Sequence, residues 1–380
     1  MTDIRALLTE LVRSDSTNPE LVPGGAGEGG VARIVARVLE GAGFEVEVDE
    51  IRPGRPNVIG RLRGTGGGPS LMLCSHMDVV GAPPAMFEPV VADGRMVGRG
   101  ASDMKSGLAA SLVAAEQIAA GPRPAGDLLV SGVIDEEWES LGALAIARSH
   151  PVDAVILPEQ TNLDIVDEHG GFGWYDVEVR GVEVAGIEAD RGIDTIALLA
   201  PVLQGIADYD AELRAAPRPP YGRPSVHAST IAGGTQYPAY PVRTVLGIER
   251  CTVPGEQIAD TRTRLEQLLA GAHGPRARFD AELRTVVERD ALALDPGGRI
   301  VPVLRAAAAG VLGAEPAIRG DMGWMDSGVL VEAGIPCVIF GPTGGGEHGP
   351  GEWVELESVQ ACADVLAATA RAFCGTPSAA

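Results

Sequence analysis

Apolar positions in the first 170 residues follow helical and strand patterns in turn. Residues 4–12 place apolar side chains at helical spacing, which predicts a first helix. Short apolar runs at 71–75, 127–134 and 154–157 predict buried strands, and 106–120 is rich in strong helix formers. Because strands and helices alternate, we predict an α/β domain with a mostly parallel sheet flanked by helices.

The pattern changes near Gly170, where an alternating aromatic strand begins. Helices and strands of a compact α+β unit follow as far as residue 290, after which the α/β pattern resumes. We therefore predict one domain formed by 1–171 and 291–380, interrupted by an inserted α+β domain at 172–290.

Polar side chains occur where the first buried strand ends. The run 71–75 leads into His76, and Asp78 follows two positions later. Residues i and i+2 of a strand point the same way, so Asp78 can hold the proton of one ring nitrogen of His76 and direct the other at a metal. A capping histidine beside a turn aspartate is the alternative, and a lone His-x-Asp motif does not decide between them.

Three more acids occupy similar positions. Asp103 lies just ahead of the predicted helix 106–120, where it can cap the helix or reach a metal. Glu136 and Glu137 follow the strand 127–134 and point in different directions. One of them can bind a metal while the other faces a substrate.

Glu159 and His348 complete the pattern, since each follows a predicted strand. The carboxyl ends of parallel strands lie along one edge of a sheet, so these side chains are expected to converge. Two imidazoles and three carboxylates suit two divalent cations, zinc first, with cobalt or manganese as substitutes. Such a pair would activate a water for amide hydrolysis, with a spare carboxylate to move its proton.

Composition narrows the classes of partner. The formal net charge of −22 repels nucleic acid and anionic membrane surfaces, which leaves a small-molecule substrate. The N-terminus lacks the pattern of a signal peptide, and no apolar run is long enough to span a bilayer. Five scattered cysteines without zinc-finger spacing predict reduced thiols in the cytoplasm.

Taken together, the motifs resemble the M20 metallopeptidase family, in the branch of acetylornithine deacetylase and succinyl-diaminopimelate desuccinylase. In chain order they are SHMDVV, GRGASDMKSG, DEEWES, LPEQTN, IAGGTQ, VPGE, GIPCVIFGP and EHGPGEWV. The resemblance implies a metal-dependent amidohydrolase in which 1–171 and 291–380 form the metal-binding catalytic domain. It also implies that 172–290 is a lid, with a homodimer through this lid as one alternative for the assembly.

The resemblance further implies roles for individual residues. The implied metal ligands are His76, Asp103, Glu137, Glu159 and His348, with Asp103 bridging two zinc ions. Asp78 is the implied orienting partner of His76, and Glu136 the implied general acid/base.

Three positions of the predicted lid depart from the family pattern. Ala185 stands where the family usually has a histidine that stabilises the oxyanion, and Pro238 where many members have an asparagine. Cys251 stands where an arginine usually grips the substrate carboxylate, with Arg250 adjacent. Asp326 aligns with a family aspartate near the site and is a weaker candidate for contact with substrate. Losing one oxyanion donor commonly costs about 10²–10³ in rate, so these departures predict an altered substrate.

Three functions stay open at this stage. The first is a dizinc amidohydrolase acting on an unusual N-acyl or peptide-like substrate, including one without a terminal carboxylate. The second is a metal-dependent biosynthetic enzyme that catalyses a non-hydrolytic step on the same scaffold. The third is a non-catalytic binding protein, which an intact Glu136 disfavours because a pure binder needs no general base.

Overall fold

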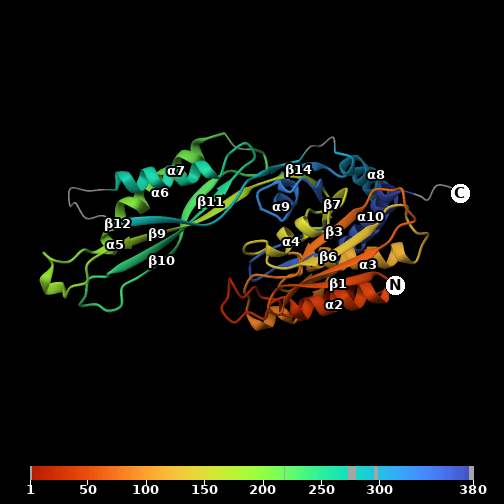
Figure 1. The fold of residues 1–380 in the computed structure, drawn as a ribbon, viewed down its shortest axis with the longest axis horizontal. Helices are drawn as coiled ribbons and strands as arrows, with labels where there is room; N and C mark the ends of the chain where they lie inside the picture. Colours follow the sequence, from red (N-terminus) through yellow and green to blue (C-terminus); the bar gives the residue numbers. More distant parts are fainter. Residues whose placement is uncertain (1, 218, 273–279, 295–297, 376–380) are drawn as a thin grey trace. The chain divides into compact units, whose positions relative to one another are not determined.

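The computed structural model divides the described part of the chain into two compact units (Figure 1). The described residues are 2–217, 219–272, 280–294 and 298–375. The first unit contains those of 1–167, 294–319 and 325–380. The second unit contains those of 168–293 and 320–324.

The short segment 320–324 lies in the second unit, although the sequence pattern did not place it in the insert. It belongs there because the Asp321 carbonyl accepts the Gly170 N–H at 3.1 Å and the Trp324 ring centroid lies 5.5 Å from that of Phe172. The assignment of 172–290 as a separate lid domain remains a prediction.

The central sheet of the first unit is mixed. Its strands are β1 (Glu45–Arg52), β2 (Arg55–Leu62), β6 (Leu128–Val133), β3 (Leu71–His76), β7 (Ala154–Leu157), β15 (Cys337–Ile339) and β8 (Ile165–His169), in that spatial order. The four strands β6, β3, β7 and β15 are parallel, whereas β1, β2 and β8 pair antiparallel to their neighbours. Two short strands, β13 (Leu292–Ala293) and β14 (Ile318–Asp321), also pair with β8. The predicted α/β class is thus confirmed, but the sheet is mixed rather than mostly parallel, because only its four central strands run parallel.

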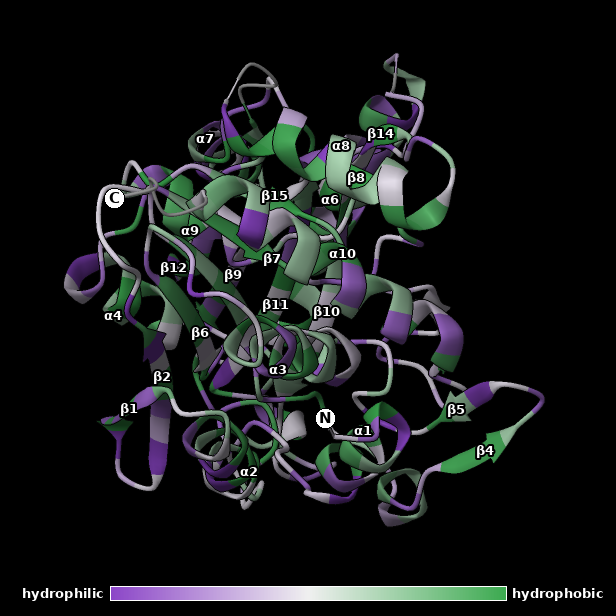
Figure 2. Cartoon of the chain, turned by 90° about the vertical axis from the view of Figure 1, so that its right-hand side faces the viewer, coloured by the Kyte–Doolittle hydropathy of each residue, from purple (hydrophilic) through white to green (hydrophobic). Residues whose placement is uncertain are grey.

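Helices cover both faces of this sheet. They are α1 (Ile4–Arg13), α2 (Gly29–Gly41), α3 (Lys105–Ala119), α4 (Leu141–Ser149), α8 (Ile300–Leu312), α9 (Ser327–Glu332) and α10 (Leu356–Cys374). Alternate residues of β3 take part in different cores: Leu71 and Leu73 pack with α1, α2, α3, α8 and α10, whereas Met72 and Cys74 pack with α4 and α9. Figure 2 shows that α3 carries mostly apolar residues, as expected for a helix buried along most of its length.

The parallel strands bring their carboxyl ends to one edge of the sheet. His76 is the last residue of β3, whereas β6 and β7 end just before Glu136 and Glu159. A small antiparallel sheet carries the remaining loop; its strands are β4 (Val90–Ala92), β5 (Arg95–Val97), β16 (Gly344–Gly345) and β17 (Trp353–Glu355). The loop between β16 and β17 contains His348.

The second unit is a four-stranded antiparallel sheet with helices on one face. The strands lie in the order β10 (Ser225–Gly233), β11 (Arg243–Thr252), β9 (Gly171–Arg180) and β12 (Asp280–Arg289). Figure 1 shows α6 (Ala200–Ala215) and α7 (Ala259–Gly271) on the same face, preceded by the short α5 (Thr195–Leu198). Tyr175, Val177 and Val179 of β9 point alternately into this core, which explains the alternating pattern in the sequence.

Candidate metal centre

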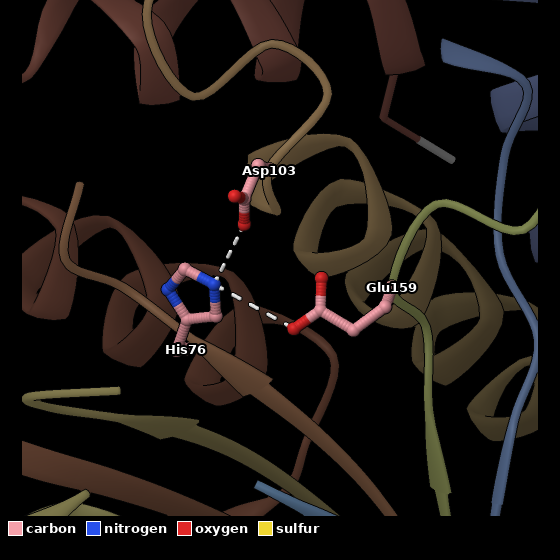
Figure 3. Close-up of side chains that lie close together, drawn as sticks. All are labelled: His76, Asp103 and Glu159. Atoms are coloured by element: carbon pink, nitrogen blue, oxygen red, sulfur yellow. Dashed lines mark hydrogen bonds and ion pairs between the residues drawn. The ribbon is translucent and has the colours of Figure 1, made fainter. Parts of the chain in front are cut away.

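Two groups of potential metal ligands meet at Asp103. In the first group, His76 Nε2 lies 3.0 Å from Asp103 Oδ1 and 3.6 Å from Glu159 Oε1 (Figure 3). In the second, His348 Nε2 lies 3.2 Å from Asp103 Oδ2 and 3.1 Å from Glu137 Oε2. Within each group the three ligand atoms lie within 4.8 Å of one another. Each oxygen of Asp103 therefore faces one group, which is the disposition that a bridging carboxylate requires.

One tight backbone contact lies between the segments that carry Asp103 and Glu159 of the first group. Gly107, in the first turn of α3, approaches the Pro158 backbone so closely that a Cβ would lie 1.8 Å from its carbonyl oxygen. Only glycine allows this approach, which sets the start of α3 against the segment that carries Glu159. Asp103, just ahead of the helix, thereby reaches His76.

The groups carry more negative charge than their burial favours. Burial raises the pKa of Glu137, and the charge of Asp103 raises it further. Burial likewise raises the pKa of Glu159 well above its usual range. Hydrogen bonds to Asp103 and Glu137 raise the pKa of His348 to about 11. A set of imidazole nitrogens and carboxylate oxygens with surplus buried charge fits divalent cations such as zinc.

The contact between Asp78 and His76 differs from the side-chain contact that the sequence predicted. The ring Nδ1 lies 3.0 Å from the main-chain oxygen of Asp78 and 3.5 Å from its carboxylate. The carboxylate accepts the N–H groups of Glu136 and Glu137, each at 3.1 Å. Asp78 therefore holds both the imidazole and the backbone of the two glutamates.

Glu136 lies beside the two groups without belonging to either. Its Oε2 is 3.9 Å from His76 Nε2, and its side chain is 10% exposed. Burial raises the pKa of Glu136 well above its usual range, and the charge of Asp326 adds to that rise. A carboxylate with a raised pKa, next to potential metal ligands, is suited to accept and release a proton near neutral pH.

A buried polar network supports Asp78, and sequence reasoning missed it. Asn18 Nδ2 donates to Asp78 Oδ2 at 2.8 Å and to Asp135 Oδ1 at 3.1 Å. Arg55 donates to Asp135 at 2.9 Å and to both oxygens of Glu28 at 2.7 and 2.8 Å. The one available signal was the acid at 135 directly before the glutamate pair. The sequence pattern marked Asn18 only as the end of the first helix.

Three of the four predicted substrate positions of the second unit are uncharged, and the fourth, Arg250, is buried. Ala185 and Pro238 are exposed on neighbouring segments, joined by a 2.8 Å hydrogen bond from Gly186 N–H to the Pro238 carbonyl. Cys251 is a half-buried thiol whose pKa is raised by burial. Arg250 is 3% exposed, and its guanidinium donates to Glu256 at 2.9 Å and to the Cys251 carbonyl.

Asp326, the remaining candidate, belongs to the first unit and is 2% exposed. It directly precedes α9, and its charge contributes to the raised pKa values of Glu136 and Glu159. The structure thus brings Asp326 into electrostatic range of these glutamates, outside the two groups of potential ligands.

Comparisons with known proteins show the family and the fold of the chain. The model of peptidase family M20/M25/M40 matches residues 72–372. The chain is 28% identical, over 82% of each sequence, to N-formyl-4-amino-5-aminomethyl-2-methylpyrimidine deformylase of Bacillus subtilis. It is 27% identical, over 95% of this chain and 96% of the relative, to succinyl-diaminopimelate desuccinylase of Xanthomonas euvesicatoria. An M20 family metallo-carboxypeptidase of Sulfolobus solfataricus has the same fold, with a TM-score of 0.78 at 17% identity over 98% of this chain and all of the other.

None of the helices within the described residues is both long and apolar enough to cross a membrane.

Proposed function

The chain belongs to peptidase family M20/M25/M40, a family of metal-dependent hydrolases, and from this we propose that it is a dizinc hydrolase of an amide bond in a small N-acyl substrate. The observation that carries the proposal is Asp103, whose two oxygens lie 3.0 Å from His76 and 3.2 Å from His348. His76 and Glu159 would hold one zinc, and His348 and Glu137 the other. Cobalt or manganese would suit the same nitrogen and oxygen donors.

Each residue then has a defined task. When bound, a zinc pair supplies Lewis acidity and lowers the pKa of a water that serves as nucleophile. Asp78 fixes the ring of His76 through its main-chain oxygen and fixes the glutamate pair through its carboxylate. Glu136 Oε2 accepts the proton of the attacking water and returns it to the leaving amine nitrogen. The raised pKa of Glu136 matches both halves of this transfer.

We propose that the substrate lacks a carboxylate next to the amide. Ala185, Pro238 and Cys251 carry no charge that could grip an anion, and Arg250 is buried and committed to Glu256. A charge-assisted pair to substrate would require Arg250 to leave that partner. The name of the deformylase relative describes an N-formyl aminomethylpyrimidine and no carboxylate. We therefore favour N-formyl or other short N-acyl amines over N-acyl amino acids.

Amine release tests the function and the substrate class together. Paired N-formyl and N-acetyl amides, with and without a carboxylate next to the amide, are incubated with the zinc-loaded chain. The neutral amides are expected to release amine faster. Full zinc occupancy without release from any amide would favour the alternative of a metal-dependent, non-hydrolytic step.

A variant of Glu136 tests the mechanism. Glu136→Gln is expected to lower the turnover of an active amide by about 10²–10⁴-fold while leaving the zinc content unchanged. Glu47→Gln, a charge removal on the exposed strand β1, is the matched control and should retain activity. Unchanged turnover of Glu136→Gln would refute the role given to this residue.

We also propose a homodimer through the second unit. β10 is an edge strand that is exposed from His227 to Gly233 and has no acidic, lysine or arginine side chain. The opposite edge, β12, carries alternating charges that discourage pairing. An exposed edge without such charges is prone to pair with another chain. A second copy of β10 would satisfy both edges at once.

Sedimentation of two lysine variants tests the dimer. Ile231→Lys, on β10, is expected to shift a dimer to monomer, because it buries an unpaired charge at the interface. Val48→Lys, at a similarly exposed valine on edge strand β1, should leave the mass unchanged. A wild-type chain that sediments as a monomer at micromolar concentration would refute the dimer.

A further inference from the structure

A buried acid that is in neither ligand group joins the two loops that carry Asp103 and His348. Glu352 is fully buried and follows His348 by four residues. Its Oε1 accepts the N–H groups of Ser102 at 2.9 Å and Asp103 at 3.0 Å. Its Oε2 accepts the N–H of Gly100 at 3.0 Å and Nη1 of Arg99 at 2.6 Å. One carboxylate therefore receives four donors from the loop that ends at Asp103.

The conformation of that loop is shaped around the carboxylate. Gly100 has a φ of +79°, and a Cβ there would lie 2.9 Å from both Lys105 Cδ and Val79 Cγ1. This left-handed turn is open to glycine and strained for other residues. It directs the N–H groups at 100, 102 and 103 toward one point, where Glu352 lies.

Two more hydrogen bonds join the same two loops, and their donors again come from the loop that ends at Asp103. The Gly98 N–H donates to the main-chain oxygen of Glu352 at 3.0 Å, and Arg99 Nη2 donates to the Gly349 carbonyl at 3.2 Å. Glu352 thus connects segments that lie about 250 residues apart in sequence. Within the described residues, its carboxylate is the side-chain acceptor that holds the Asp103 N–H.

We infer that Glu352 is a positioning residue for the metal centre: it fixes the backbone at Asp103 so that one carboxylate oxygen faces His76 and the other faces His348. This inference rests on the proposed function in that it takes Asp103 as the shared ligand. A bridging carboxylate must satisfy two positions at once, so a small backbone shift would misplace at least one oxygen. Groups that orient metal ligands commonly change metal affinity by about 10–100-fold when they are lost.

The competing explanation is that Glu352 is only the partner of Arg99 in a buried ion pair. Two variants separate these roles, because both break the same pair. Arg99→Met removes the guanidinium but keeps the carboxylate on the three backbone N–H groups. Glu352→Gln removes the carboxylate and places an NH₂ group where two donors already point. If Glu352→Gln weakens metal binding more than Arg99→Met does, the difference therefore measures the contribution of the contact between Glu352 and the backbone N–H groups.

The readout is metal affinity, independent of any substrate. The full chain is stripped with a chelator and titrated with Co²⁺ alone, following visible absorbance for coordination and elemental analysis for stoichiometry. Glu352→Gln is expected to weaken Co²⁺ binding by about 10–100-fold and to change the absorbance spectrum. Arg99→Met is expected to stay within about threefold of wild type. Glu355 lies three residues after Glu352 and forms an exposed ion pair with Arg95. The control variant Glu355→Gln breaks that pair and should bind Co²⁺ as the wild type does.

The outcomes decide separately on the inference and on the proposed function. Equal Co²⁺ affinity of the folded variants Glu352→Gln and Arg99→Met would overturn the positioning role. A wild-type chain that binds no Co²⁺ would instead overturn the proposed metal centre. If Glu352→Gln does not fold, the double variant R99M/E352Q takes its place, since removing both members of a buried pair leaves no unpaired charge. Wild-type Co²⁺ affinity in that folded double variant would also overturn the inference.

Discussion

Arg55 is the cation on which three buried carboxylates of the first unit depend. Its guanidinium donates to Glu28 at 2.7 and 2.8 Å and to Asp135 at 2.9 Å, and Asn18 links Asp135 to Asp78. Glu28, Asp78 and Asp135 are fully buried, and Arg55 is 6% exposed. Arg55→Met keeps most of the aliphatic volume and removes the only guanidinium that this group contacts within the described residues.

The expected cost follows from the buried charges left behind. Breaking a buried ion pair by removing one partner typically costs about 3–5 kcal/mol, because the other charge stays uncompensated. Burial raises the pKa of Glu28, whereas the hydrogen bond from Arg55 lowers that pKa. For a unit of this size, 1 kcal/mol corresponds to roughly 2–4 °C, so we expect the melting temperature to fall on the order of 10 °C.

Calorimetry with two further variants tests this reasoning. Arg37→Met breaks an exposed pair with Glu10, at 2.7 Å and with both side chains more than half exposed, and should cost at most about 1 kcal/mol. The double variant R55M/E28Q removes one of the stranded carboxylates and should recover part of the loss. An Arg55→Met variant that melts no lower than Arg37→Met would refute the account of the buried network.

Three further predictions concern the metal, the support of Asp78 and pH. Chelation should lower the melting temperature, because a cation at about a thousandfold over its Kd adds about 4 kcal/mol to the free energy of unfolding. His348→Ala removes one candidate metal ligand, so chelation should lower the melting temperature of this variant by less in scanning calorimetry. Asn18→Ala should lower turnover or Co²⁺ affinity by about 10–100-fold. Asn18→Asp should lower them at least as much, because the new carboxylate would face those of Asp78 and Asp135. Wild-type values in both variants would contradict this prediction. Burial lowers the pKa of His169 to about 4, so below its ordinary pKa near 6.5 the unfolded chain binds a proton that the folded chain excludes. Stability should therefore fall from pH 6.5 toward 4, by about 2 kcal/mol at pH 5 from this residue, and His169→Asn should remove that part of the slope in urea unfolding. Parallel curves for the two proteins would contradict this prediction.

Local patterns of apolar and polar residues were sufficient to predict the fold class and the candidate ligands. Buried strands read as apolar runs, and parallel strands must deliver the residues after them to one edge of the sheet. His76, Glu137 and Glu159 could therefore be placed near one another from the sequence. The family to which the chain belongs was recognisable from the sequence as well, because its motifs follow one another in the order of that family.

Residues that act through another residue were not accessible in this way. Glu352, Asn18 and Arg55 gain their roles from contacts across 27 to 253 positions of the chain. A buried acid surrounded by glycines gives no periodic signal that distinguishes it from a surface loop. Asp78 shows the same limit, since spacing explained its proximity to His76 but not its hydrogen bonds to the backbone of Glu136 and Glu137.

The amino-acid sequence by itself determined that an α/β chain with a strongly negative charge brings two histidines and several acids to strand ends. Only the tertiary structure decided that the two oxygens of Asp103 face opposite histidines, that Arg250 is bound to Glu256, and that Glu352 gathers the loop around Asp103. The physical reason is the distance along the chain over which each signal acts. Periodicity reports which side of an element is buried, whereas the direction of a carboxylate depends on donors that approach from distant parts of the chain.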